Sequence, residues 1–83
     1  MTIKERVDNG VALLDEYLPE WRTYIDKDAL DLSCGLLCII GQLELWPICN
    51  DLDKARKCGF IRELGTDYET EYDSLQKEWL KRL

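Results

Sequence analysis

The chain has 83 residues, of which 17 are acidic and 11 are basic, so its formal net charge is −6. This length corresponds to one small domain, and we treat residues 1–83 as a single helical domain. The acidic charge argues against nucleic acid as a partner, because phosphate binding requires clustered Lys and Arg. The sequence contains no histidine, which excludes His general bases, Ser-His-Asp triads and His-ligated metal sites.

The N-terminal segment has the period of an amphipathic helix. Its apolar residues recur every three or four positions, at Ile3, Val7, Val11, Leu14 and Leu18. Thr2 and Glu5 fit a capping box at its start, and Pro19 predicts its end. A glycine inside a helix costs stability, so Gly10 predicts close packing against a neighbouring segment.

The middle of the chain is predicted to hold the central helix. Residues 21–25 suit one or two helical turns, and the three aspartates of residues 26–31 are typical of a turn. Residues 32–45 leave no polar face, which predicts a helix buried on all sides. Trp46 and Pro47 are expected to break this helix and to lie in a connection.

The remaining sequence predicts two further helices. Asn50 or Asp51 is expected to cap a short helix that ends at Cys58, with Gly59 as the left-handed residue after it. The last segment again has apolar residues at helical spacing: Tyr68, Tyr72, Leu75, Trp79 and Leu83. Sustained alternation is absent from the sequence. We therefore predict an all-α fold, a compact bundle of four to five short helices around a central apolar helix at about residues 32–45.

The four cysteines are Cys34, Cys38, Cys49 and Cys58. They lack the paired C-x-x-C spacing of structural zinc sites, so we expect free, mostly buried thiols, no metal and no cofactor. If the chain binds a metal, these four residues are the ligands. The longest uncharged stretch runs from Leu32 to Leu43, shorter than the roughly 20 residues that a membrane helix needs. We therefore expect no membrane partner.

The aromatic residues have two interpretations. Three tryptophans in so short a chain either complete the core or lie partly exposed as anchors of a protein interface. Trp21 and Trp46 are the candidates for exposed anchors, because each lies close to a proline in a predicted connection. Asp28 and Glu44 are candidate charges at the rim of that interface. No phosphate-binding glycine loop and no catalytic arrangement is present, so we do not expect an enzyme.

Several short motifs carry a family resemblance. They are Trp21, Ile25-Asp26, Leu30-Asp31-Leu32-Ser33, Cys38-Ile39-Ile40-Gly41-Gln42-Leu43, Gly59-Phe60 and Trp79. Together they resemble a family of small proteins of unknown function from tailed phages of actinobacteria. The chain differs from that family in its cysteine spacing, which argues against an inherited metal or redox role. The resemblance implies a phage-encoded protein that acts in the cytoplasm of the host bacterium.

These observations lead to one functional hypothesis with two alternatives. The hypothesis is a non-enzymatic, phage-encoded protein that binds and modulates a host or phage protein. A homodimer is left open as a variant of it. The first alternative is a cysteine-based metal-binding or redox module, and the second is an acidic mimic of nucleic acid.

Overall fold

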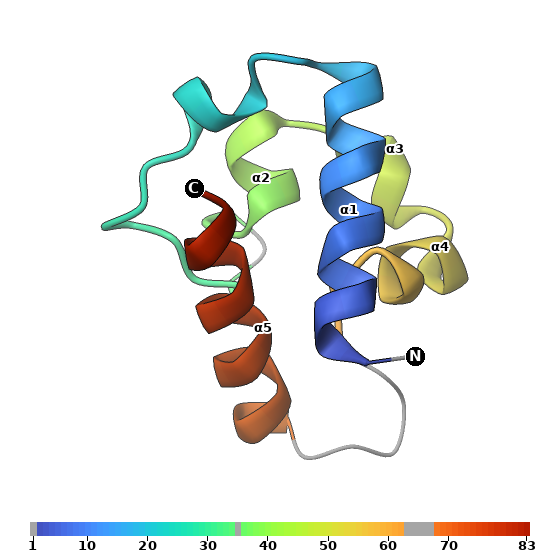
Figure 1. The fold of residues 1–83 in the computed structure, drawn as a ribbon, viewed down its shortest axis with the longest axis vertical. Coiled ribbons are helices and arrows are strands. Elements are labelled where there is room, and N and C mark those ends of the chain that lie inside the picture. The colour runs from blue at the N-terminus through green and yellow to red at the C-terminus, as the bar shows by residue number, and fades with distance from the viewer. Residues whose placement is uncertain (1, 35, 63–67) are drawn as a thin grey trace.

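The computed structural model describes residues 2–34, 36–62 and 68–83. In this part of the chain there is no strand, and the elements are α1 (Ile3–Tyr17), the 3₁₀ helix η1 (Trp21–Tyr24), α2 (Ile39–Leu43), α3 (Trp46–Cys49), α4 (Leu52–Lys57) and α5 (Tyr68–Arg82). The long helices α1 and α5 pack against each other, and α4 packs on α1 (Figure 1). Helix α3 connects this group to α2 and η1. The all-α prediction is confirmed.

Helix α1 begins and ends where its sequence predicts. The Thr2 hydroxyl accepts the Glu5 N–H at 3.1 Å, and the Glu5 carboxylate accepts the Thr2 N–H at 3.2 Å. The last helical residue is Tyr17, two positions before Pro19. Val7 and Leu14 lie fully buried on the apolar face. This face of α1 forms one side of the hydrophobic core.

Two tryptophans and a phenylalanine form the centre of the core. Trp79 stacks on Phe60 with ring centroids 5.4 Å apart, and Trp21 meets Trp79 edge to face at 5.9 Å. The Trp79 indole donates its N–H to the Gly59 carbonyl at 2.8 Å. Large buried rings dominate the stability of a small core, so these contacts tie η1, α5 and the segment after α4 together.

Gly10 lets α1 approach this core closely. A Cβ at position 10 would lie 2.2 Å from the carbonyl oxygen of Cys58 and 2.8 Å from the Trp79 ring. The close packing predicted for Gly10 is therefore confirmed. Gly59 has a φ of +72° after α4, which confirms its predicted left-handed conformation.

A buried arginine joins three parts of the bundle. Arg6 of α1 is 1% exposed and pairs with Glu71 of α5 at 2.6 Å. Its other guanidinium nitrogens donate to the carbonyls of Arg56, at 2.7 Å, and Ile61, at 2.6 Å. A buried charge is tolerated only when it is paired and hydrogen-bonded. Arg6 therefore holds α1 to α5 and to both ends of the Arg56–Ile61 segment.

The central helix is much shorter than predicted, because only residues 39–43 of the segment 32–45 form α2. Its first part instead forms turns stabilised by side chains. The Asp31 carboxylate accepts both the N–H and the hydroxyl of Ser33, at 3.0 and 2.6 Å, and the Cys38 sulfur caps α2 by accepting the Gly41 N–H. Such local hydrogen bonds compete with helix formation. The prediction of burial is also wrong for Leu36, which is 73% exposed.

The structure corrects the prediction for Trp46 and Pro47 as well. These residues do not form a connection but begin α3, with Pro47 in the first turn. Proline is favoured there, because the first N–H groups of a helix have no partner within it. The chain between α2 and α3 consists of Glu44 and Leu45 alone. Asp51 caps α4 by accepting the Lys54 N–H at 3.1 Å, as predicted.

Candidate partner-binding surface

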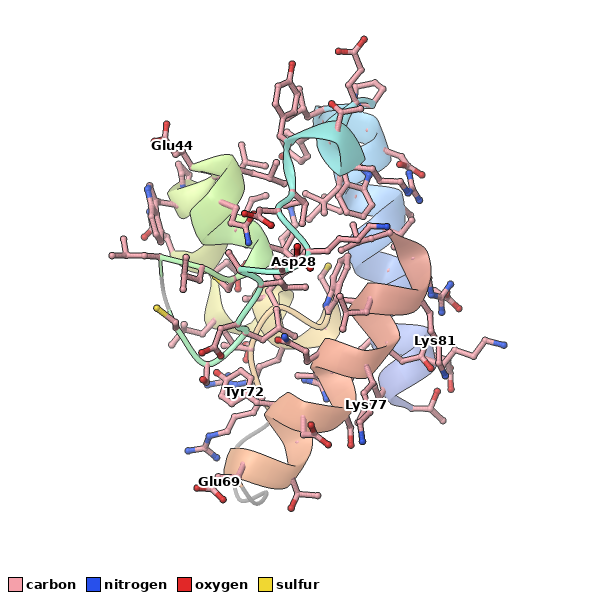
Figure 2. All side chains as sticks on the ribbon, turned by 90° about the vertical axis from the view of Figure 1, so that its left-hand side faces the viewer. Asp28, Glu44, Glu69, Tyr72, Lys77 and Lys81 are labelled. Atoms are coloured by element: carbon pink, nitrogen blue, oxygen red, sulfur yellow. The ribbon has the colours of Figure 1, made fainter. Side chains whose placement is uncertain are left out.

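The four predicted partner-binding residues have different environments. Trp46 is 43% exposed, as expected for an interface anchor. Glu44 and Asp28 are exposed carboxylates. In Figure 2, Glu44 projects from the edge of the molecule, whereas Asp28 lies nearer the middle of that face. Trp21 is fully buried.

The prediction that Trp21 is an exposed anchor is therefore wrong. Its ring contacts Trp79, and its indole N–H donates to the Asp15 carboxylate at 2.8 Å. This hydrogen bond lowers the pKa of Asp15 below its ordinary value. The guanidinium of Arg22 covers the ring at 4.5 Å from its centroid. Trp21 thus belongs to the core, because the 3₁₀ turn after Pro19 directs it inward.

Leu45 and Pro47, the sequence neighbours of Trp46, help to line an apolar groove that we call the α3 groove. Its volume is about 310 Å³, and its lining residues come from α1, the Glu44–Leu45 connection, α3 and the start of α4: Tyr17, Leu45, Pro47, Ile48, Asp51 and Lys54. Tyr17 is 60% exposed, and the Lys54 ammonium lies 5.9 Å from the centroid of its ring. The groove therefore combines an apolar floor with a charged rim.

A second groove of about 290 Å³ lies between the end of α1, η1 and the end of α2. We call it the Glu44 groove, and its lining residues are Leu18, Tyr24, Gln42, Leu43 and Glu44. Tyr24 is 57% exposed. The side chain of Gln42 is occupied within the fold, because its oxygen accepts the Asp26 N–H at 2.7 Å and its nitrogen donates to the Leu37 carbonyl at 2.9 Å.

The two grooves adjoin along the chain. Tyr17 and Leu18 are consecutive residues, as are Glu44 and Leu45, and each pair contributes one residue to each groove. These pairs lie at the C-terminal ends of α1 and α2, at the upper end of the molecule in Figure 1. We call the combined lining of the two grooves, together with Trp46, the apical surface. Exposed apolar surface with a polar rim is typical of protein interaction sites.

Sequence reasoning found part of this surface. It identified Trp46 and Glu44 but missed Tyr17 and Tyr24, which lie at the ends of α1 and η1. An aromatic residue next to a predicted helix end was the available signal. Asp28 lines neither groove, so the structure does not bring it together with Trp46 and Glu44.

Glu44 has an unusual backbone conformation. Its φ is +56° and its ψ is +35°, in the left-handed region, where it ends α2. A residue with a Cβ pays roughly 1–2 kcal/mol there, and helices usually place glycine or asparagine at such a position. Within the described residues its carboxylate has no ion pair or hydrogen bond. The chain therefore carries an uncommitted carboxylate at a strained position in the groove.

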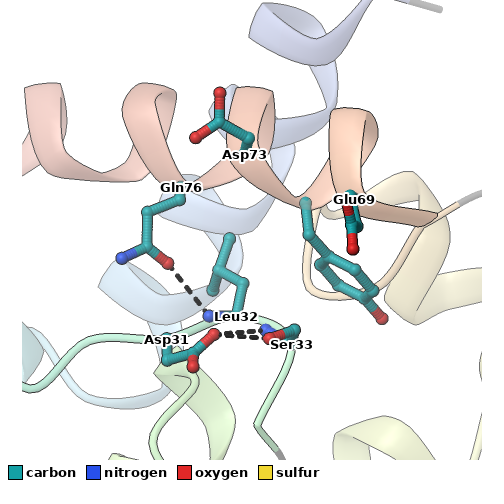
Figure 3. A pocket seen from close by; sticks show the side chains of 7 residues that line it. Asp31, Leu32, Ser33, Glu69, Asp73 and Gln76 are labelled. Carbon is teal, nitrogen blue, oxygen red and sulfur yellow. Dashed lines mark hydrogen bonds between the residues drawn. The ribbon is translucent and has the colours of Figure 1, made fainter. Parts of the chain in front are cut away.

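A third cavity, the acidic cleft, lies between the 31–33 turn and α5 (Figure 3). It measures about 260 Å³ and is lined by Asp31, Leu32, Ser33, Glu69, Tyr72, Asp73 and Gln76. Its polar groups hold the fold together: Gln76 accepts the Leu32 N–H at 3.0 Å and donates to the Leu30 carbonyl. Among the residues that the structure describes, no group of three or more Cys, Asp or Glu side chains is arranged to hold a metal ion.

The cysteines do not form a reactive centre among the described side chains. Cys34 is half-buried, and Cys38 and Cys58 are buried. Burial raises the pKa of both Cys38 and Cys58, which disfavours the nucleophilic and metal-binding thiolate. The side chain of Cys49 lies outside the described part of the chain.

Comparisons with known proteins identify no relative: no family model, no curated protein and no solved structure matches the chain. In the described residues, no helix has the length and apolar character required to span a bilayer. Evidence for function therefore comes from the chain's own surface.

Proposed function

We propose that this chain is a non-enzymatic, phage-encoded protein that binds and modulates a host or phage protein in the bacterial cytoplasm. The observation that carries the proposal is the apical surface, where the exposed Tyr17 and Tyr24 each line a groove and the exposed Trp46 follows the groove residue Leu45. Tryptophan and tyrosine dominate the binding energy of protein interfaces. The phage origin and the cellular location rest on the motif resemblance alone.

The charge distribution favours this proposal over an acidic mimic of nucleic acid. Many carboxylates are paired with neighbouring cations rather than displayed as a regular array. Examples are Asp73 with Lys77 at 3.0 Å and Glu78 with Lys81 at 3.2 Å. Such pairs cancel the field that would imitate a phosphate backbone. The charge distribution therefore favours an apolar protein interface over an interface formed by carboxylates alone.

A tagged pull-down from actinobacterial lysate at low and high salt tests the proposal. We expect one stoichiometric protein that stays bound at high salt, because apolar contacts are not screened. Trp46→Ala should lose it, whereas Leu80→Ala should retain it, since Leu80 is an exposed apolar residue on α5 outside both grooves. Equal loss in both variants, or no partner in any lysate, would contradict the proposal. Light scattering on the purified chain identifies the case in which the partner is a second copy.

A further inference from the structure

We infer that the Glu44 groove binds an arginine side chain of the partner, with an apolar residue of the same segment seated in the adjoining α3 groove. This inference rests on the proposed function and names the chemistry of the partner.

The groove offers one charge. Both polar atoms of the Gln42 amide are bonded inside the fold, to residues 26 and 37. Leu18 and Leu43 contribute only apolar surface. The remaining polar groups are the Glu44 carboxylate and the Tyr24 hydroxyl, so a cationic donor is the ligand group that complements the groove.

Asp51 and Asp26 are carboxylates that are engaged within the fold. Asp51 caps α4 through the Lys54 N–H, and Asp26 accepts the N–H groups of Asp28 and Ala29. Glu44 has no such bond within the described residues. It also occupies a left-handed position that glycine would fill at lower cost. This backbone outlier motivates a functional role for the Glu44 side chain.

Arginine fits this groove better than lysine. Its planar guanidinium pairs with a carboxylate through two parallel N–H bonds and stacks on an aromatic ring. The exposed Tyr24 ring and the Glu44 carboxylate line the same groove. The aliphatic stem of arginine is long enough to cover the apolar surface of Leu18 and Leu43. Lysine would form the ion pair without the stacking or the bidentate geometry.

The neighbouring α3 groove defines the rest of the segment. Its floor is formed by Leu45, Pro47 and Ile48, and its charged rim residues Asp51 and Lys54 are already engaged in the cap and over the Tyr17 ring. The groove therefore takes an apolar side chain. Consecutive residues of the chain line the two grooves, so the inference places the arginine and the apolar residue in one short segment of the partner.

Random dodecapeptides displayed on phage provide the probe. They are selected on the immobilised wild-type chain, and binding of the enriched peptides is then measured by fluorescence polarisation. We expect peptides in which an arginine lies within a few residues of a large apolar residue. Replacing that arginine by citrulline, or Glu44→Gln in the protein, should weaken binding by about tenfold or more, as expected for a charge-assisted hydrogen bond.

Matched variants separate the contributions. Asp28→Asn removes another exposed carboxylate outside both grooves and should leave binding unchanged. Tyr24→Phe should keep affinity because the ring remains, whereas Tyr24→Leu should weaken it. Peptide lysine in place of arginine should bind more weakly than arginine.

Three results overturn the inference: enriched peptides without arginine, binding indifferent to Glu44→Gln, or no enrichment above the bare matrix. The lysate experiment distinguishes these failures from failure of the proposed function. A partner that is lost with Trp46→Ala but retained with Glu44→Gln would leave the binding protein intact and remove the arginine site.

Discussion

The α1–α4–α5 framework and the segment from residue 24 to 46 are built in different ways. In the framework, apolar residues at helical spacing are buried around the stacked rings of Phe60 and Trp79. In the other segment, side-chain hydrogen bonds hold an irregular backbone: Gln42 within the segment bonds to residues 26 and 37, and Gln76 of α5 bonds to residues 30 and 32. Side-chain packing defines the first region, and side-chain-to-backbone hydrogen bonds define the second.

The two regions expose apolar side chains in different settings. A helix can turn its apolar face inward along its whole length, whereas a chain of turns cannot do so. Between residues 24 and 46 the exposed apolar side chains are Tyr24, Leu36, Leu37 and Trp46. The framework also leaves Tyr17, Leu52 and Leu80 exposed, and Tyr17 belongs to the apical surface, so both regions contribute to that surface. The following variants test whether the two regions behave separately.

The largest effect is expected in the framework, from Arg6→Ala. This change removes the ion pair of the buried Glu71 carboxylate and the guanidinium donors to the carbonyls of Arg56 and Ile61. Breaking a buried pair in this way costs about 3–5 kcal/mol of the free energy of unfolding. Urea denaturation measures it. Lys77→Ala, which removes an exposed pair with Asp73, serves as the control and should cost under about 1 kcal/mol; equal losses would contradict the assigned role of Arg6.

Gly10→Ala is expected to have the next largest effect. In an exposed helix this substitution stabilises by about 0.4–1 kcal/mol. Here the new Cβ would meet the Cys58 carbonyl oxygen at 2.2 Å, so we expect a loss of about 1–3 kcal/mol from overpacking. Thermal denaturation measures the effect, and we expect the melting temperature to fall. An increase in melting temperature would show that α1 does not lie this close to Cys58.

Gln42→Leu should destabilise only the segment from residue 24 to 46. It removes the acceptor of the Asp26 N–H and a donor to the Leu37 carbonyl, which corresponds to about 1 kcal/mol. We expect faster hydrogen exchange at the Asp26 amide and unchanged protection in α1 and α5. Uniformly faster exchange in all helices would contradict the separation of the two regions.

The smallest effect is a gain, from Glu44→Gly. The left-handed backbone costs a residue with a Cβ roughly 1–2 kcal/mol, which glycine avoids. Glycine loses more conformational entropy on folding, and this loss offsets part of the gain. We therefore expect about 0.5 kcal/mol of added stability, measured by urea denaturation, together with weaker peptide binding. A loss of stability would show that the Glu44 side chain serves the fold rather than a partner.

The sequence predicted the framework well, because each signal there is local. A capping box, a proline, a glycine at a close approach and a helical period specified α1, and Asp51 and Gly59 specified the limits of α4. It failed for residues 32–38, where the Asp31 hydrogen bonds to Ser33 outweigh the apolar pattern. Arg6 was missed because its partners Arg56, Ile61 and Glu71 are 50 or more positions away.

Part of the candidate surface was predictable. Trp46 and Glu44 are exposed as predicted, although Trp46 begins α3 instead of lying in a connection. The burial of Trp21 depends on its contact with Trp79, which is distant in sequence. The closeness of Trp21 to a proline therefore led to the wrong prediction that it is exposed. The contribution of Tyr17 depends on the position of α3 and is likewise not a local property.

Site-specific crosslinking tests the central claim most directly. The photoreactive residue p-benzoylphenylalanine replaces Trp46 in one variant and Leu80 in a second, and each is irradiated in actinobacterial lysate. A partner bound at the apical surface predicts one crosslinked protein from position 46 and none from position 80. The same crosslinks from both positions, or none from position 46, would contradict a binding role for the apical surface.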